Sequence, residues 1–465
     1  MVGAIPVNAQ DDVLIPLAPM DATMDTLRVA ILYIYPPPSS STASYDLARL
    51  EQSFLSLVDE DYPLLIGKLD VNPQTGVASV RQTPEALEQG ARGIRFEKDP
   101  ASKQTAEDVL ASLSWDFMPK VRGEDEIIAV KGTLLADGGM TVGVDINHIL
   151  FDGEAMFTFM KTWSQHYNGL DKHERLVICH ERHLLAGKGE GPKLEHSEFR
   201  LTAGKLLARA KDGTLAPKAM KKPPPTTQYL FHMSPANMAA LKKAVNGASD
   251  PAAPGPSYSS TVDAITALFT VLISRARGHG QDVRISTALN GRKRLDPPLP
   301  DNYAGNAVFH TMSTHSKSDL QLESDGEDAV SLVTISKIAR GIRASILERD
   351  NMYLRDAIAF VASQSDLSTV SENIQFFFGT GVAFTCWANL GMYDAEFEGT
   401  RPWYAFAPRV PCMDGFVMIT EAMKGLDGLD VLVFLECAAM EKFKKLAANV
   451  PYLQDKEDKE DKGVP

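Results

Sequence analysis

Two residues four positions apart, His148 and Asp152, have types and a spacing that could do chemistry. Imidazole has a reference pKa of about 6.5, so a histidine can accept a proton near neutral pH and return it later in a reaction. We interpret His148 as a general base. A structural histidine at the end of a strand is the alternative interpretation.

The elements on both sides of His148 are predicted to hold it at a junction. The alternating run from Met140 to Ile146 predicts a strand that leads into the histidine. The residues after Gly153 predict a helix, because apolar side chains recur at helical spacing: Met156, Phe157, Met160 and Trp163. A strand-to-helix junction can present a side chain to a cleft while both elements keep it rigid.

The composition excludes several function classes. Of the 465 residues, 44% are hydrophobic and 23% charged, which is typical of globular proteins. A formal charge of −13 disfavours nucleic acid as a partner. The N-terminus lacks a signal-peptide pattern, and no apolar run approaches the roughly 20 residues of a membrane span. The four cysteines form no CxxC pair, so we expect neither a metal site nor a disulfide framework, and a cytoplasmic location.

The chain is predicted to consist of two halves. Residues 1–186 carry His148 and residues 228–454 form the second half, with a Gly-, Lys- and Pro-rich, exposed crossover at 187–227 between them. The alternating charges of residues 455–465 are typical of a disordered tail. Other expected elements are a strand at 27–35, helices at 46–59 and 264–277, a strand at 283–289 and a terminal hairpin of 417–421 with 429–435.

Four segments carry a family resemblance. Asn147-His-Ile-Leu-Phe-Asp-Gly153 resembles the HxxxDG signature of the BAHD acyl-CoA-dependent acyltransferases, and residues 62–68, Tyr-Pro-Leu-Leu-Ile-Gly-Lys, resemble an early segment of that family. Residues 290–300, Asn-Gly-Arg-Lys-Arg-Leu-Asp-Pro-Pro-Leu-Pro, with Tyr303-Ala-Gly-Asn306, resemble its central signature. Residues 429–440 are similar to its closing strand and helix. One segment departs from the pattern: where the family has DFGWG, this chain reads Glu396-Phe-Glu-Gly-Thr400, which is typical of divergent microbial or fungal members.

The resemblance implies a fold and an activity. The expected fold is α/β, with two similar domains, each a mixed sheet flanked by helices, and a tunnel between them. The expected activity is transfer of an acyl group from acyl-CoA, used as a co-substrate, to a small hydroxylated secondary metabolite. Direct transfer with His148 as the base is expected, because the chain has no GxSxG elbow for an acyl-enzyme route. No bound cofactor or metal is implied, and we expect a monomer.

The resemblance also assigns roles to other residues. Asp152 would form an ion pair with Arg292 and support the junction, rather than orient His148 as in a triad. Gly153 is interpreted as a residue that permits a sharp turn, and Glu396 as a structural residue of the altered loop. Possible oxyanion or substrate contacts, each with simple packing as the alternative, are Asn306, Thr385, Trp387 and a backbone amide near Asp152-Gly153. Thr261 and Arg401 are candidates to contact CoA.

Three alternatives remain open at the level of the sequence. A condensation-domain-like protein would take its acyl group from a carrier-protein thioester and form an amide or ester. A non-catalytic binding protein on the same fold would carry out no transfer. His310 and His315 are interpreted as incidental to the chemistry. The alternative interpretation of His310 is that it lines the acceptor pocket.

Overall fold

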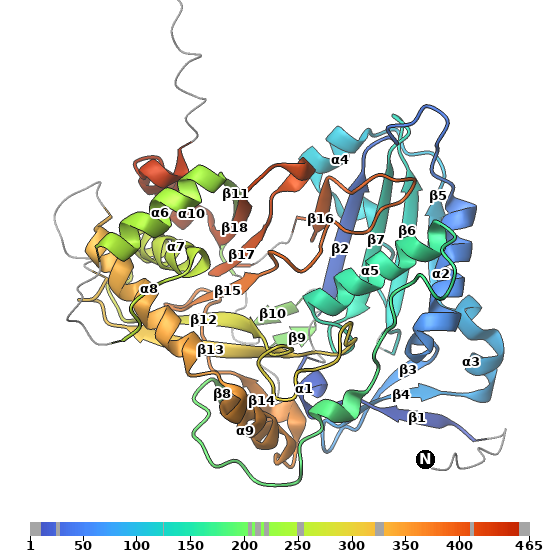
Figure 1. Cartoon of the computed structure of the whole chain (residues 1–465), viewed down its shortest axis with the longest axis horizontal. Coiled ribbons are helices and arrows are strands. Elements are labelled where there is room, and N and C mark those ends of the chain that lie inside the picture. The colour runs from blue at the N-terminus through green and yellow to red at the C-terminus, as the bar shows by residue number, and fades with distance from the viewer. Residues whose placement is uncertain are drawn as a thin grey trace, which may run out of the picture.

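Two mixed β-sheets and the helices packed on them form the frame of the chain (Figure 1). The structure is a computed structural model, and it describes residues 11–24, 28–123, 125–202, 207–209, 215–217, 223–248, 255–320, 330–409 and 413–454. The predicted α/β architecture is confirmed. None of the helices in these ranges has the length and apolar character that crossing a bilayer requires.

The first sheet holds the strand that leads to His148. Its strands, in spatial order, are β16 Tyr404–Phe406, β2 Arg28–Tyr35, β7 Met140–Asn147, β6 Ile128–Leu134 and β5 Arg95–Asp99. Only β5 and β6 pair in parallel, so the sheet is mixed. Helices α2 (Leu47–Asp61) and α5 (Gly153–Tyr167) contact each other beside the sheet. Strand β7 is buried at every position, which makes the approach to His148 rigid.

The second sheet belongs to the second half of the chain. Its strands, in spatial order, are β11 Thr226–Met233, β18 Leu429–Glu436, β17 Phe416–Glu421, β15 Val382–Cys386, β12 Val283–Asn290 and β13 Val308–His315. Helices gather on one side of this sheet in Figure 1: α6 Pro235–Gly247, α7 Thr261–Arg277, α8 Leu332–Leu347 and α10 Cys437–Ala447. Helix α7 begins before the predicted residue 264, because the Ser260 hydroxyl accepts from the Asp263 backbone N–H at 3.2 Å and caps it.

Shorter elements complete the fold. A small sheet contains β1 Val13–Pro16, β4 Ala78–Gln82 and β3 Lys68–Val71. Two pairs of short strands are β9 Leu207–Arg209 with β10 Leu215–Pro217, and β8 Phe199–Leu201 with β14 Val370–Glu372. The remaining α-helices of the described ranges are α1 Pro19–Ala22, α3 Pro84–Gln89, α4 Ala106–Ser112 and α9 Asn351–Ala362.

Strand β16 connects the two halves. It lies in the second half of the sequence, yet it pairs antiparallel with β2 of the first sheet, with Tyr404 opposite Ile34. The sheets therefore do not separate at the predicted crossover. The crossover was predicted to be exposed, but part of it is covered. Strand β8 pairs with β14, and both His196 and Glu198 are buried. The predicted charged tail, residues 455–465, lies outside the described residues.

Candidate active site

His148 occupies the turn between β7 and α5. The Asn147 side-chain oxygen accepts from the Ile149 backbone N–H at 3.1 Å, and the Asp152 side chain accepts from the Ala155 N–H at 3.0 Å as the N-cap of α5. Both ends of the turn are therefore fixed by local side-chain bonds. His148 is half-buried, whereas its neighbours Asn147 and Ile149 are fully buried. The predicted strand-to-helix junction is present.

Asn306 fixes the proton positions of the His148 ring. Its amide nitrogen donates to the carbonyl of His148 at 2.8 Å, the carbonyl of Ile149 at 3.0 Å and the Asp21 carboxylate at 3.0 Å. A flipped amide would place its oxygen against those three acceptors, so the Asn306 oxygen must face His148 Nδ1, 3.1 Å away. Since that oxygen can only accept, Nδ1 carries the hydrogen. The Nε2 lone pair is then free to act as a base.

This geometry corrects one predicted role. Asn306 was a candidate to donate to an oxyanion or a substrate, but both N–H groups of its amide are occupied by carbonyl and carboxylate oxygens. Asn306 is 1% exposed and acts on His148 from behind. It is a positioning residue.

Asp21 supports Asn306 and was missed in the sequence. Its buried carboxylate accepts from the backbone N–H of Asn306 at 3.0 Å and from the Ala18 N–H at 2.9 Å, and it lies 3.3 Å from the Arg182 guanidinium. Arg182 in turn donates to the carbonyl of Leu150 at 3.0 Å. A single acidic residue inside the short helix α1 gives no pattern that predicts this partner at a separation of 285 residues.

Asp152 and Arg292 form the predicted ion pair. Arg292 donates to both carboxylate oxygens, with distances of 2.7 and 2.9 Å. The Ala307 backbone N–H also donates to Asp152, at 2.9 Å, and Arg292 further donates to the carbonyl of Gly305 at 2.8 Å. Burial raises the pKa of Asp152, but the Arg292 guanidinium outweighs burial and holds that pKa below its ordinary value. The carboxylate is thus a charged brace between the halves.

Gly153 is favoured by close packing rather than by an unusual turn. Its φ is not among the positive values of the described backbone, which corrects the predicted role. A Cβ at this position would lie 3.0 Å from Trp387 Nε1 and 3.3 Å from Trp387 Cε2. The indole of Trp387 therefore packs directly on the first residue of α5.

Thr385 and Trp387 reach the same junction from β15. Both line a small cavity of about 50 Å³ together with Asp152 and Gly153. The Trp387 ring lies 5.3 Å from Phe157 and 5.3 Å from Phe406, centroid to centroid. A larger cavity of about 370 Å³ lies alongside, between α5 and residues 389–394, and the two share Glu154, Asn290 and Leu390.

The other predicted contacts lie apart from His148. Glu396 and Arg401 pair with each other at 2.7 Å on the surface, with side chains 41% and 63% exposed. Thr261 is the half-buried first residue of α7. A role for Thr261 or Arg401 in CoA binding stays a prediction. In the altered loop, Phe397 is fully buried beside Tyr35, Trp163 and Tyr167.

The buried position of His148 tunes its basicity. Burial lowers the pKa of His148 and so favours the neutral ring, while Asp152 and the Asn306 contact act in the opposite direction and only partly offset it. The charge of His310 lowers the pKa of His148 further. A neutral imidazole with a free Nε2 is the form that a general base requires.

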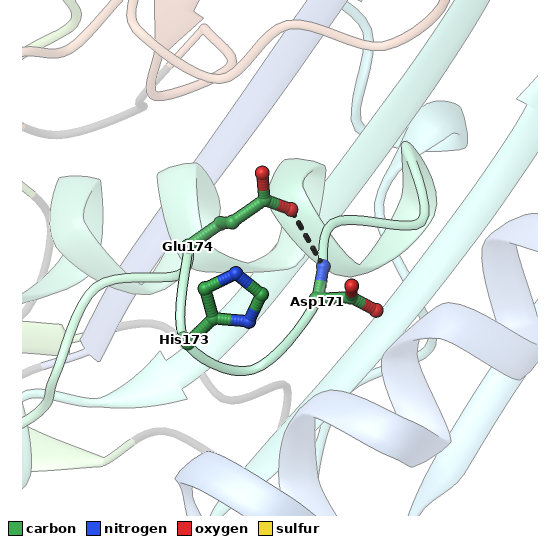
Figure 2. A group of neighbouring side chains, drawn as sticks. All are labelled: Asp171, His173 and Glu174. Carbon is green, nitrogen blue, oxygen red and sulfur yellow. Dashed lines mark hydrogen bonds between the residues drawn. The ribbon is translucent and has the colours of Figure 1, made fainter.

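One group of possible metal ligands lies outside this site. Asp171, His173 and Glu174 are exposed in the loop after α5 (Figure 2). Glu174 accepts from the Asp171 backbone N–H at 3.1 Å, as the dashed line in Figure 2 marks. This bond closes a surface turn, which accounts for the grouping.

Comparisons with known proteins place the chain among transferases. Residues 5–449 match the model of a family described as the Transferase family. A hydroxycinnamoyltransferase of Narcissus pseudonarcissus is 24% identical over 433 residues, 92% of this chain and 93% of that protein. A shikimate O-hydroxycinnamoyltransferase of Nicotiana tabacum is 26% identical over 316 residues, 66% of each chain. The structure of F. graminearum TRI101 with coenzyme A and deoxynivalenol has a TM-score of 0.72 at 17% identity and covers 96% of this chain and 98% of its own.

Proposed function

The chain belongs to the Transferase family, the BAHD acyl-CoA-dependent acyltransferases, and from that membership we propose that it is an O-acyltransferase for a small hydroxylated metabolite. The observation that carries the proposal is the contact between Asn306 and His148, because it leaves Nε2 of a neutral, half-buried imidazole free to accept a proton. N-acylation would use the same base.

The reaction is a direct transfer. The acceptor hydroxyl attacks the thioester carbonyl while His148 Nε2 removes its proton, so a C–O bond forms and a tetrahedral oxyanion develops. The C–S bond then breaks, and the same proton passes from Nε2 to the departing CoA thiolate. With the Asn306 amide occupied, the candidate oxyanion donors among the described residues are a backbone amide near Asp152-Gly153, Thr385 and Trp387. The products are an ester and free CoA.

His148→Ala is the decisive variant. His183→Ala is its control, because His183 is 71% exposed and pairs with exposed Glu181. The release of free thiol is followed with acetyl-CoA and 4-coumaroyl-CoA against shikimate, deoxynivalenol and simple alcohols. Loss of the base should lower the rate by about 10²–10⁴-fold, while the control keeps the wild-type rate. Equal release by wild type and His148→Ala with every acceptor would refute the enzymatic role and favour a binding protein.

The donor and the assembly are tested separately. Transfer from an acyl carrier protein but not from acyl-CoA would favour the condensation-type alternative. We propose that the chain works as a monomer in the cytoplasm. Light scattering on a sizing column tests the monomeric state.

A further inference from the structure

The cavity of about 370 Å³ lies between the two halves of the chain, next to the candidate active site but outside it. One wall is helix α5 of the first half, and the facing walls include residues of the segments 290–302 and 389–394 of the second half. His148 is not among the described residues that line it. A cavity of this size can hold a small organic molecule, and such sites form preferentially where two structural units meet.

Helix α5 turns one polar and apolar face toward this cavity. Four of its residues line the wall at positions i, i+3, i+4 and i+7, which lie on one side of a helix: Glu154, Phe157, Thr158 and Lys161. Phe157 supplies an aromatic surface, and Leu390 of the facing loop adds a second apolar side chain. The cavity can therefore contact an apolar group as well as polar ones.

The charged side chains of the wall leave one ammonium group unpaired. Lys161 pairs with Asp394 at 3.0 Å, and the Glu154 carboxylate accepts from the Asn290 amide. Both contacts join α5 to the second half of the chain. Lys293, in contrast, is exposed and has no hydrogen-bond or ion-pair partner in the described part of the chain. Its accessible ammonium can donate to an anion that enters the cavity.

Two neutral donors of the wall are also accessible. The exposed Asn389 amide and the half-buried Thr158 hydroxyl have no side-chain hydrogen bond among the described residues. The loop that carries Asn389 is nevertheless fixed, because its backbone N–H donates to Glu421 at 3.0 Å and the Asp394 N–H donates to the carbonyl of Gly391 at 3.0 Å. A ligand therefore meets a wall that is already formed, which lowers the cost of binding.

The cavity adjoins the brace beside the candidate base. Glu154 follows Gly153 in the sequence, and Lys293 follows Arg292, the partner of Asp152. Residues of the cavity wall thus come directly after both ends of this ion pair. A molecule that contacts both α5 and Lys293 joins the two halves at the same place as the brace.

We propose that this cavity binds a small amphipathic carboxylate, with the carboxylate at Lys293 and an apolar body against Phe157 and Leu390. The inference goes beyond the transfer reaction, because it assigns a second ligand site outside the reaction centre. A cationic ligand would be repelled by Lys293, and a neutral one would gain no ion pair. A dianion such as a phosphate is disfavoured by the carboxylates of Glu154 and Asp394 in the same wall.

Matched ligands test the proposal by titration calorimetry on the full chain without acyl-CoA. The probes are benzoate, phenylacetate and 3-phenylpropionate, the amide of each, benzylamine and phenyl phosphate. At least one carboxylate should bind wild type about tenfold or more tightly than its own amide, since only the carboxylate forms a charge-assisted hydrogen bond. Benzylamine and phenyl phosphate should bind more weakly than that carboxylate.

Variants then locate the site. Lys293→Gln should weaken carboxylate binding by about tenfold and leave amide binding unchanged, whereas Lys293→Arg should retain most of the affinity. Asn389→Gly removes the amide from the opposite wall but keeps the backbone, whose φ is 62°, and should weaken binding by about threefold. Lys442→Gln is the control, because Lys442 is an exposed residue of α10 without a partner among the described residues. His148→Ala should bind the carboxylate as wild type does.

The outcomes are separate from those of the transfer assay. The inference is overturned if wild type binds none of the carboxylates, or binds each one no better than its amide. Unchanged affinity in both Lys293→Gln and Asn389→Gly, or loss of binding in His148→Ala, would place the ligand elsewhere and also overturn it. A carboxylate preference that falls in Lys293→Gln and persists in Lys442→Gln and His148→Ala supports the site, whether or not the chain transfers an acyl group.

Discussion

Arg292 holds both carboxylate oxygens of Asp152 across a separation of 140 residues, so the aspartate of the HxxxDG segment is turned away from its histidine. The two residues join the start of α5 to the segment after β12. Asp152 is 1% and Arg292 5% exposed, and neither charge could remain buried without the other. The ion pair is thus part of the scaffold that holds the start of α5 against the segment after β12, next to His148.

Asp152→Asn should therefore reduce stability and activity together. Loss of one partner from a buried pair costs about 3–5 kcal/mol, since the other charge stays buried without compensation. Urea unfolding and soluble yield measure the loss. The control is Glu441→Gln, whose exposed pair with Lys444 is expected to contribute less than about 1 kcal/mol. A stable and fully active Asp152→Asn protein would contradict the bracing role.

Asn306→Ala should affect kcat rather than substrate binding. Without the amide oxygen, His148 loses the partner that fixes its tautomer and its ring orientation, and a small misplacement of a catalytic group can cost about 10²-fold in rate. Steady-state kinetics should show a fall in kcat of that order at nearly constant KM.

Asn246→Ala is the matched control for Asn306→Ala. The Asn246 side chain is likewise hydrogen-bonded, with three contacts: its amide donates to the carbonyls of Lys242 and Ser259, and its oxygen accepts from the Ser259 N–H. It lies at the end of α6, however. Its loss should lower stability without changing kcat. If both variants lowered kcat equally, the specific role of Asn306 would be wrong.

The acid limb of the pH–rate profile should lie below pH 6.5. The base works only when His148 is neutral, and burial lowers the pKa of His148. The value of kcat/KM should therefore stay constant as the pH falls through 6.5, the ordinary pKa of histidine. The ionisable groups whose charges interact with that of His148 are Asp152, His310 and Glu372. In His310→Ala the limb should move to higher pH, because a positive charge that disfavours protonation of His148 is gone. A wild-type limb at or above pH 6.5 would contradict this assignment.

The altered loop should act on stability and not on chemistry. Phe397 is fully buried, with ring centroids 5.0 Å from Tyr167 and 5.2 Å from Tyr35. Phe397→Ala should cost about 3–5 kcal/mol of unfolding free energy, while the KM for acetyl-CoA stays close to wild type. Tyr258→Ala, at a 54% exposed aromatic residue, is the control. A raised KM with unchanged stability would instead place the loop at the donor site.

The sequence was informative where local patterns decide structure. Helix α7 followed from its apolar stripe and its cap, and the contact of Asp152 with Arg292 followed from a family resemblance. Features that depend on tertiary packing could not be predicted. Strand β16 is three residues long, and no local pattern says which sheet it joins. The tight space at Gly153 comes from the indole of Trp387, 234 positions later in the chain. His310 was interpreted as incidental because Glu372, its partner on another strand, is not visible in the spacing of residues.

His315 should make the stability of the protein depend on pH between about 4 and 6.5. It is 5% exposed, and burial lowers its pKa to about 4, with Lys337 adding to that effect and Asp319 opposing it. In the unfolded chain the ring titrates near 6.5, so below that pH the unfolded state binds a proton that the folded state does not. Stability is therefore complete above pH 6.5 and is lost as the pH falls toward 4. A shift of this size corresponds to about 3 kcal/mol.

Equilibrium urea unfolding at pH 7.5 and pH 4.5 measures this dependence in wild type and in His315→Asn. The asparagine keeps a polar group near Ser313, which lies 3.2 Å from His315 Nε2, but it cannot become charged in this range. The difference in unfolding free energy between the two proteins should shift in favour of His315→Asn at the lower pH, and the exposed His183→Asn variant is the matched control. If the difference were the same at both pH values, His315 would carry none of the acid sensitivity, and other buried groups would have to account for it.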